Sequence, residues 1–76
     1  MHHFTFSLVV NATDLEDGYY RRGIQKIVVT TDEGLRIQLP VRRFAPYISA
    51  VGIRGRFQLT LDSQNRFVCM QKIGEV

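Results

Sequence analysis

The sequence predicts a mainly β domain of the α+β class, and three patterns support this prediction. Apolar and polar residues alternate over residues 3–10, and two β-hairpin patterns follow at residues 24–39 and 56–73. One short helix pattern, at residues 11–22, interrupts the strands. The expected order is strand, helix, strand, strand, short helical turn, strand, strand. This order favours a five-stranded bent antiparallel sheet or a half-open barrel.

The first strand is predicted from its two-residue period. Aromatic and aliphatic residues fall on one face and polar residues on the other, which is typical of a half-buried strand. The expected apolar face carries Phe4, Phe6, Leu8 and Val10.

The helix is predicted from its end signals. Thr13 and Glu16 have the spacing of a capping box, in which both side chains satisfy free backbone N–H groups of the first turn. Arg21 and Arg22 would lie near the C-terminal end, where cations are favourable, and Gly23 can adopt the left-handed conformation that ends helices. The acidic residues of the first turn interact favourably with the positive end of the helix dipole. We therefore assign them no catalytic or binding role.

Residues 24–39 give the clearest hairpin pattern. Apolar residues alternate on both sides of an Asp-Glu-Gly turn, in which Gly34 supplies the positive φ. On the second strand, alternate residues from Leu35 onward are expected to face the core. Pro40 ends this strand because proline has no N–H to donate to a ladder.

The alternation is lost over residues 41–53. Their apolar spacing fits a helical turn that places Phe44 and Ile48 on the sheet. Gly52 and Gly55 are expected to bracket a loop or a bulge.

The last strand, residues 66–73, has apolar residues on both faces, which leaves its register open. The alternative apolar pairs are Phe67 with Cys69 and Val68 with Met70. We expect such a strand to be covered on both sides, by the helix on one and by a second subunit on the other.

Length and composition predict one domain over residues 1–76, with a core from about residue 4 to 73. Apolar residues make up 45% of the chain, which is enough for a small core. Cys69 is the single cysteine, so no internal disulfide can form, and a reducing compartment is expected. No signal peptide or membrane span is apparent, so we expect a cytoplasmic protein.

The net charge of +3 is unevenly distributed along the chain. Residues 1–20 hold three acidic residues and no base, whereas residues 21–76 hold all ten Lys and Arg residues against four acidic ones. Eight of the ten bases are arginine, whose planar group suits bidentate contacts with phosphate or carboxylate.

The sequence does not predict an enzyme. Nucleophilic catalysis needs a base within reach of the nucleophile, but His2 and His3 lie at a terminus that is expected to fray. Cys69 is expected to be a buried structural thiol. A structural zinc site would need four Cys or His ligands. We therefore expect no catalytic residue, no metal and no cofactor.

The remaining functional candidate is a polar, cationic surface. If the two hairpins lie side by side, their polar sides form one face. Its candidate residues are Arg36, Gln38, Arg42, Arg43, Arg54 and Arg56, with Tyr20 and Tyr47 as exposed stacking residues. The alternative is a solvated face whose charges prevent edge-to-edge aggregation.

Three segments carry a family resemblance. These are Tyr19-Tyr20-Arg21-x-Gly23, the run from Gly34 to Pro40, and Gly52-Ile53-Arg54-Gly55-Arg56-Phe57. With their spacing they make most of the chain similar to a family of short proteobacterial proteins, the domain of unknown function family 2835. The resemblance implies a bacterial cytoplasmic protein and carries no activity, cofactor or catalytic residue.

Two functional hypotheses follow. The first is a non-catalytic interaction module that binds a protein partner or a second copy of itself, because a thin core and a doubly apolar last strand favour burial against a partner. The second is a small protein that binds RNA or nucleotide phosphate through its arginine-rich face.

Overall fold

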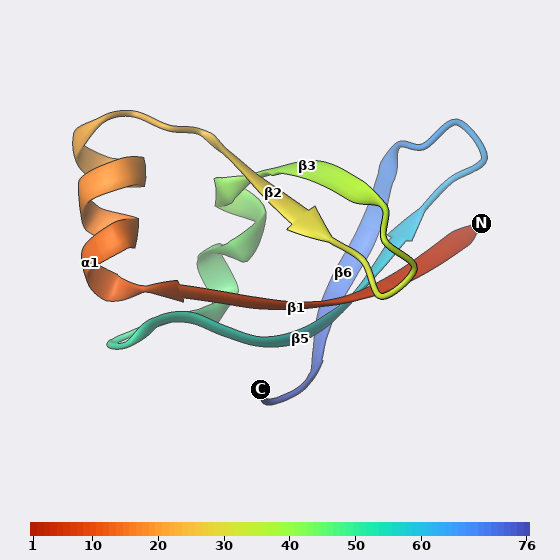
Figure 1. Ribbon diagram of the computed structural model, residues 1–76. Helices are drawn as coiled ribbons and strands as arrows, with labels where there is room; N and C mark the ends of the chain where they lie inside the picture. The colour runs from red at the N-terminus through yellow and green to blue at the C-terminus, as the bar shows by residue number, and fades with distance from the viewer.

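Two antiparallel sheets make up most of the computed structural model, which describes residues 1–76 (Figure 1). The elements in chain order are β1 (His2–Asn11), α1 (Ala12–Asp14), η1 (Leu15–Arg21), β2 (Lys26–Thr30), β3 (Arg36–Pro40), η2 (Val41–Tyr47), β4 (Ile48–Ser49), β5 (Gly52–Leu61) and β6 (Phe67–Gly74). The predicted mainly β class and element order are confirmed. The strands are divided between two sheets, and β4 is a short additional strand.

β5 is the central strand of the larger sheet. It pairs with β1 along its whole length on one side. On its other side it pairs with β4 at one end and with β6 at the other. β2 and β3 form a separate two-stranded sheet. In Figure 1 this smaller sheet crosses over β1, and the larger sheet does not close into a barrel.

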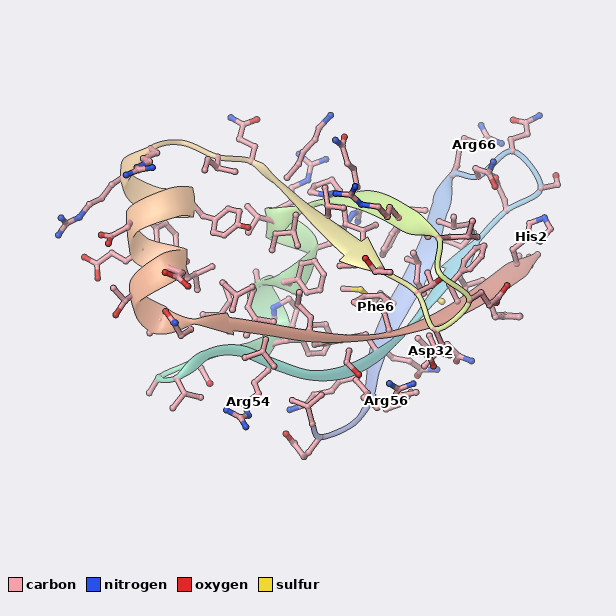
Figure 2. All side chains as sticks on the ribbon, viewed as in Figure 1. His2, Phe6, Asp32, Arg54, Arg56 and Arg66 are labelled. Carbon is pink, nitrogen blue, oxygen red and sulfur yellow. The ribbon has the colours of Figure 1, made fainter.

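The core lies between the two sheets and contains ten buried apolar residues. Its centre is aromatic, because Phe6 stacks on Phe57 with ring centroids 5.5 Å apart. Phe44 meets Phe57 edge-on at 5.6 Å, an arrangement that aromatic rings favour. η2 delivers Phe44 to this cluster, as its apolar spacing predicts. Figure 2 shows Phe6 pointing from β1 toward the smaller sheet.

The helix starts differently from its prediction. Asn11, rather than Thr13, is the N-cap, because its Oδ1 accepts a hydrogen bond of 2.8 Å from the Asp14 N–H. Thr13 lies inside the first turn and caps nothing. The single α-helical turn of α1 continues into the wider π-helical turns of η1. Gly23 has φ +71°, as the end of the predicted helix requires.

Gly52 and Gly55 lie inside β5 rather than on either side of a loop. β1 pairs with β5 as far as the Asn11–Gly52 pair, which extends the strand through both glycines. Gly52 has φ +103°, and a Cβ there would lie 2.1 Å from the Val10 carbonyl oxygen. The bulge predicted at these glycines is not found, because β5 pairs with β1 through both of them without a register shift. The nearby shift between Arg56 and Phe57 leaves Ile73 of β6 unpaired instead.

β6 is an edge strand with two register shifts. Leu61 pairs with Phe67 and Thr60 with Cys69, so Val68 has no partner between them. This register shift at Val68 turns Phe67 and Met70 toward the core. It places Cys69 on the outer face, opposite Thr60. The prediction that Cys69 is buried is therefore wrong, since its thiol is exposed.

Leu35 also differs from its prediction. It precedes β3 in the hairpin turn and is 49% exposed, because its backbone N–H and carbonyl both bond to Thr31. Thr31 takes the buried position at this end of the smaller sheet.

Candidate functional site

The predicted arginine set is divided between two faces of the molecule. The two sheets pack with their apolar faces together, so their polar faces point in opposite directions. Arg54 and Arg56 lie on the outer face of the larger sheet, whereas Arg36 and Gln38 lie on the outer face of the smaller one. The hairpins do not lie side by side in one sheet, so the structure does not form the single face that the sequence predicts.

The outer face of the larger sheet is largely satisfied by its own contacts. Arg56 donates to Ser7 Oγ at 2.6 Å and pairs with Asp32 of the β2–β3 turn. Figure 2 shows Asp32 and Arg56 next to each other at the edge of β1, with Arg54 further along β5. His3 bonds through Nδ1 to Thr60 at 3.0 Å, so this histidine belongs to a paired strand rather than a frayed terminus.

The smaller sheet and the segment after it carry cations without ion pairs. Four of the ten Lys and Arg residues form ion pairs with carboxylates: Arg21, Arg56, Arg66 and Lys72. Four of the six others lie on β2, β3 and η2. We refer to Lys26, Arg36, Gln38, Arg42 and Arg43, which are all exposed and lie on these three elements, as the cationic face. No carboxylate pairs with any member of it.

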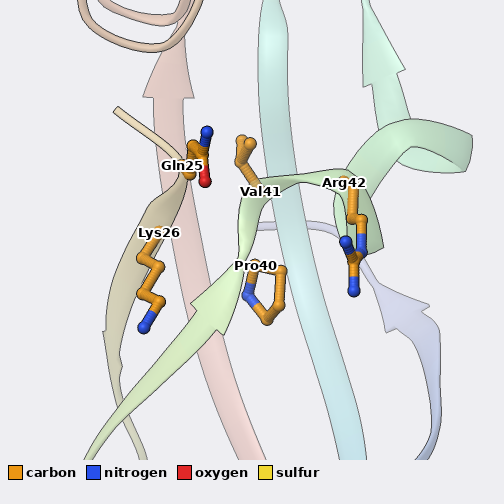
Figure 3. Close-up of a pocket in the computed structure, with 5 residues that line it drawn as sticks. All are labelled: Gln25, Lys26, Pro40, Val41 and Arg42. Carbon is orange, nitrogen blue, oxygen red and sulfur yellow. The ribbon is translucent and has the colours of Figure 1, made fainter. Parts of the chain in front are cut away.

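A hollow of about 400 Å³ opens at one end of this face (Figure 3). It forms because Pro40 ends β3 and the Val41 N–H donates to the Gln25 carbonyl oxygen at 2.8 Å, which holds the start of η2 beside the start of β2. Lys26 lies opposite Pro40 in the β2–β3 register. Figure 3 shows Lys26 and Arg42 on the two sides of Pro40, so two cations flank the hollow.

Arg43, Tyr47 and Tyr20 differ in whether their side chains are already held by contacts within the protein. The Arg43 guanidinium lies 4.1 Å from the centre of the Phe67 ring on β6, a cation–π contact that holds it in place. Tyr47 packs edge-on against Phe57 and donates its hydroxyl to the Met70 carbonyl oxygen at 3.1 Å. Tyr47 is therefore part of the core rather than a stacking residue. Tyr20 is 66% exposed, but it lies on η1, away from β3.

A second hollow, of about 350 Å³, lies at the other end of β3. It is mainly apolar, with one arginine and two amides among its lining residues. These residues are Phe4, Leu35, Arg36, Ile37, Gln38, Leu61 and Asn65. Sequence reasoning missed this hollow, because it treated Phe4 and Leu35 as ordinary core positions. The sequence contains no signal that Leu35 would remain exposed.

Asp62 lines neither hollow, although its neighbours Leu61 and Asn65 line the second one, and it has a structural role. Its Oδ1 accepts from the backbone N–H groups of Gln64 and Arg66 at 2.8 and 2.9 Å. The hydrogen bond from the Arg66 N–H, followed by those from Gln64 and the Arg66 side chain, holds the pKa of Asp62 below its ordinary value of 3.8. These bonds fix the β5–β6 turn.

No group of three or more His, Cys, Asp or Glu side chains is arranged to hold a metal ion. No helix is long and apolar enough to cross a membrane.

The fold defines a small two-layer, mainly β domain. No curated protein and no solved structure matches its sequence. The chain belongs to the family described as Protein of unknown function (DUF2835), whose model matches residues 2–73. This confirms the resemblance that the three sequence segments carry.

Proposed function

We propose that this protein is a non-catalytic RNA-binding module whose cationic face contacts the phosphate backbone. The observation that carries the proposal is that four cations without ion pairs gather on β2, β3 and η2. A cation that already pairs with a carboxylate must give up that pair to bind phosphate. The cations of this face have no such pair to break.

Lys26 and Arg42 are the best-placed phosphate ligands. They line the same open hollow, on either side of Pro40, so a phosphate in it is attracted by one ammonium and one guanidinium. Arg suits bidentate phosphate contacts and Lys acts as a point charge, so the two groups complement each other. Arg36 extends the positive charge along β3.

The proposal includes a bacterial cytoplasmic location. The exposed Cys69 thiol supports a reducing compartment, because exposed unpaired thiols are uncommon in oxidising ones.

A homodimer through β6 is the second candidate, because this strand has one free edge and exposes Val68 and Ile73. Its support is weaker. Both residues lie at register shifts and Lys72 lies between them, and bulges and lysines are features that protect edges from pairing. Light scattering that gives a monomer at high micromolar concentration would remove this candidate.

The RNA proposal is tested by the fluorescence anisotropy of a labelled RNA oligonucleotide at several salt concentrations. We expect the logarithm of the affinity to fall linearly with the logarithm of the salt concentration, with a slope of about −2 for three phosphate contacts to a single strand. Poly-glutamate is a competitor of similar charge. If it displaces the RNA at equal charge concentration, an acidic protein is the better partner.

Two charge reversals locate the surface. Arg42→Glu and Arg54→Glu remove unpaired cations from opposite faces and change the net charge equally. We expect Arg42→Glu to weaken RNA binding about tenfold and Arg54→Glu to weaken it less than about threefold. Equal losses in the two variants would show that only net charge matters, and would overturn the proposed surface.

A further inference from the structure

The second hollow presents apolar side chains that are not needed to bind the phosphate backbone of RNA. Phosphate oxygens are bound by charged and polar donors, whereas four of the seven residues that line this hollow are apolar. Leu35 is among the most exposed apolar side chains of the smaller sheet and its turn, and the fold gains little from it there. Phe4 is partly buried and packs against the core, so it presents part of an aromatic ring to the opening.

The polar residues of the same hollow suit the edge of a nucleobase. Arg36 supplies guanidinium donors, and the Gln38 and Asn65 amides each supply a donor and an acceptor. A base offers an apolar, stackable face together with a hydrogen-bonding edge. An apolar wall with a few convergent polar groups is the usual composition of a small-ligand pocket, and about 350 Å³ lies at the lower end of the usual range.

The two hollows are joined by β3. Arg36 and Gln38 line the apolar hollow, and Pro40 lines the one flanked by Lys26 and Arg42. Five strand residues span about 13 Å between them, and known single-strand sites cover about four or more nucleotides. One short strand can therefore reach both hollows. A duplex cannot, because its bases stay stacked and paired.

We propose that the hollow lined by Phe4, Leu35 and Ile37 binds an unstacked base of single-stranded RNA, while the cationic face holds the adjoining phosphates. This inference rests on the proposed function and adds the substrate class: single-stranded rather than duplex RNA. Arg36 belongs to both surfaces, since it lines the base hollow and lies on the cationic face.

The test uses Leu35→Ser with Val28→Ser as its matched control. Val28 is 43% exposed on the neighbouring strand of the same sheet and lines neither hollow. Both variants remove an exposed aliphatic side chain without changing charge, so neither is expected to unfold the protein. Circular dichroism checks that both variants keep the wild-type β spectrum.

Three probes are compared by anisotropy competition: a single-stranded oligouridylate, an RNA duplex with the same number of phosphates, and inorganic polyphosphate. We expect the oligouridylate to bind about tenfold more tightly than the duplex. Leu35→Ser should weaken oligouridylate binding about fivefold and leave polyphosphate binding unchanged, because an apolar contact with the base is lost and charge is not. Val28→Ser should change neither.

The outcomes separate this inference from the proposed function. If duplex and single strand bind equally, or if Leu35→Ser and Val28→Ser behave alike, the base site is refuted and backbone binding remains. If none of the three probes binds, both proposals fail.

Discussion

Arg56 on β5 and Asp32 in the β2–β3 turn form an ion pair that joins the two sheets, with Nη2 2.5 Å from Oδ2. The turn reaches this position because the Asp32 N–H donates to the Thr5 carbonyl oxygen at 2.8 Å, and Thr31 bridges to Phe6. Arg56 also donates to Ser7 on β1. The pair therefore connects the β2–β3 turn to β5 and, through Ser7, to β1, and it holds the smaller sheet over the larger one.

A double-mutant cycle measures the energy of this connection. We expect Asp32→Ala and Arg56→Met to show a coupling free energy of about 0.5–1 kcal/mol, since the side chains are 55% and 35% exposed and water screens them. The coupling should shrink in about 1 M salt. The more exposed Arg21–Glu16 pair is the control, and its cycle should give nearly zero. Urea denaturation provides the free energies, and equal coupling in the two cycles would contradict the account.

Gly52 is the glycine whose replacement should be most damaging. Gly52→Ala places a Cβ in the β1 backbone and also forces an unfavourable φ. We expect a loss of at least about 3 kcal/mol in unfolding free energy. Gly34→Ala is the control, because Gly34 also has positive φ but faces open space, and about 1 kcal/mol is expected. A Gly52→Ala variant as stable as Gly34→Ala would show that β1 and β5 do not approach this closely.

Acid should weaken the β5–β6 turn through Asp62. The folded-state pKa of this carboxyl is depressed, so its contribution to stability is present above its ordinary pKa of 3.8 and is lost as pH falls through the folded value. Urea denaturation of wild type and Asp62→Asn between about pH 6 and pH 2 checks this sign. The stability difference between the two proteins should narrow as the pH drops below 3.8. A difference that stays constant would contradict the assigned role.

The Cys69 thiol should react in the folded protein. It lies exposed on the outer face of an edge strand, so Ellman's reagent should modify it without denaturant, at a rate close to that in guanidinium. Cys69→Ser should abolish the signal and leave the unfolding free energy nearly unchanged. Protection of the thiol in native buffer would show that another surface covers this face.

The two-residue periods predicted most of the sheet architecture. Phe6, Ile27 and Phe57 are buried as their alternation requires, because a strand places successive side chains on opposite faces. Phe44 follows the apolar spacing of η2 in the same way. These local patterns are repeated over several residues, which makes them strong signals.

Strand partners could not be predicted in this way. The larger sheet pairs β1 with β5, whose paired residues are some fifty positions apart, and no local pattern encodes that choice. This pairing separates Arg36 from Arg54 and places them on opposite faces. The N-cap was missed for a different reason, since Asn11 and Thr13 are both good caps and the end of β1 decides between them.

The most direct test of the cationic face is a titration of isotope-labelled protein with oligouridylate, followed by amide chemical shifts. We expect the largest chemical-shift changes at residues 25–26 and 35–43, and only small changes at residues 54–60 on the opposite face. Shifts centred on β5 and the outer face of the larger sheet, with β3 unaffected, would contradict it.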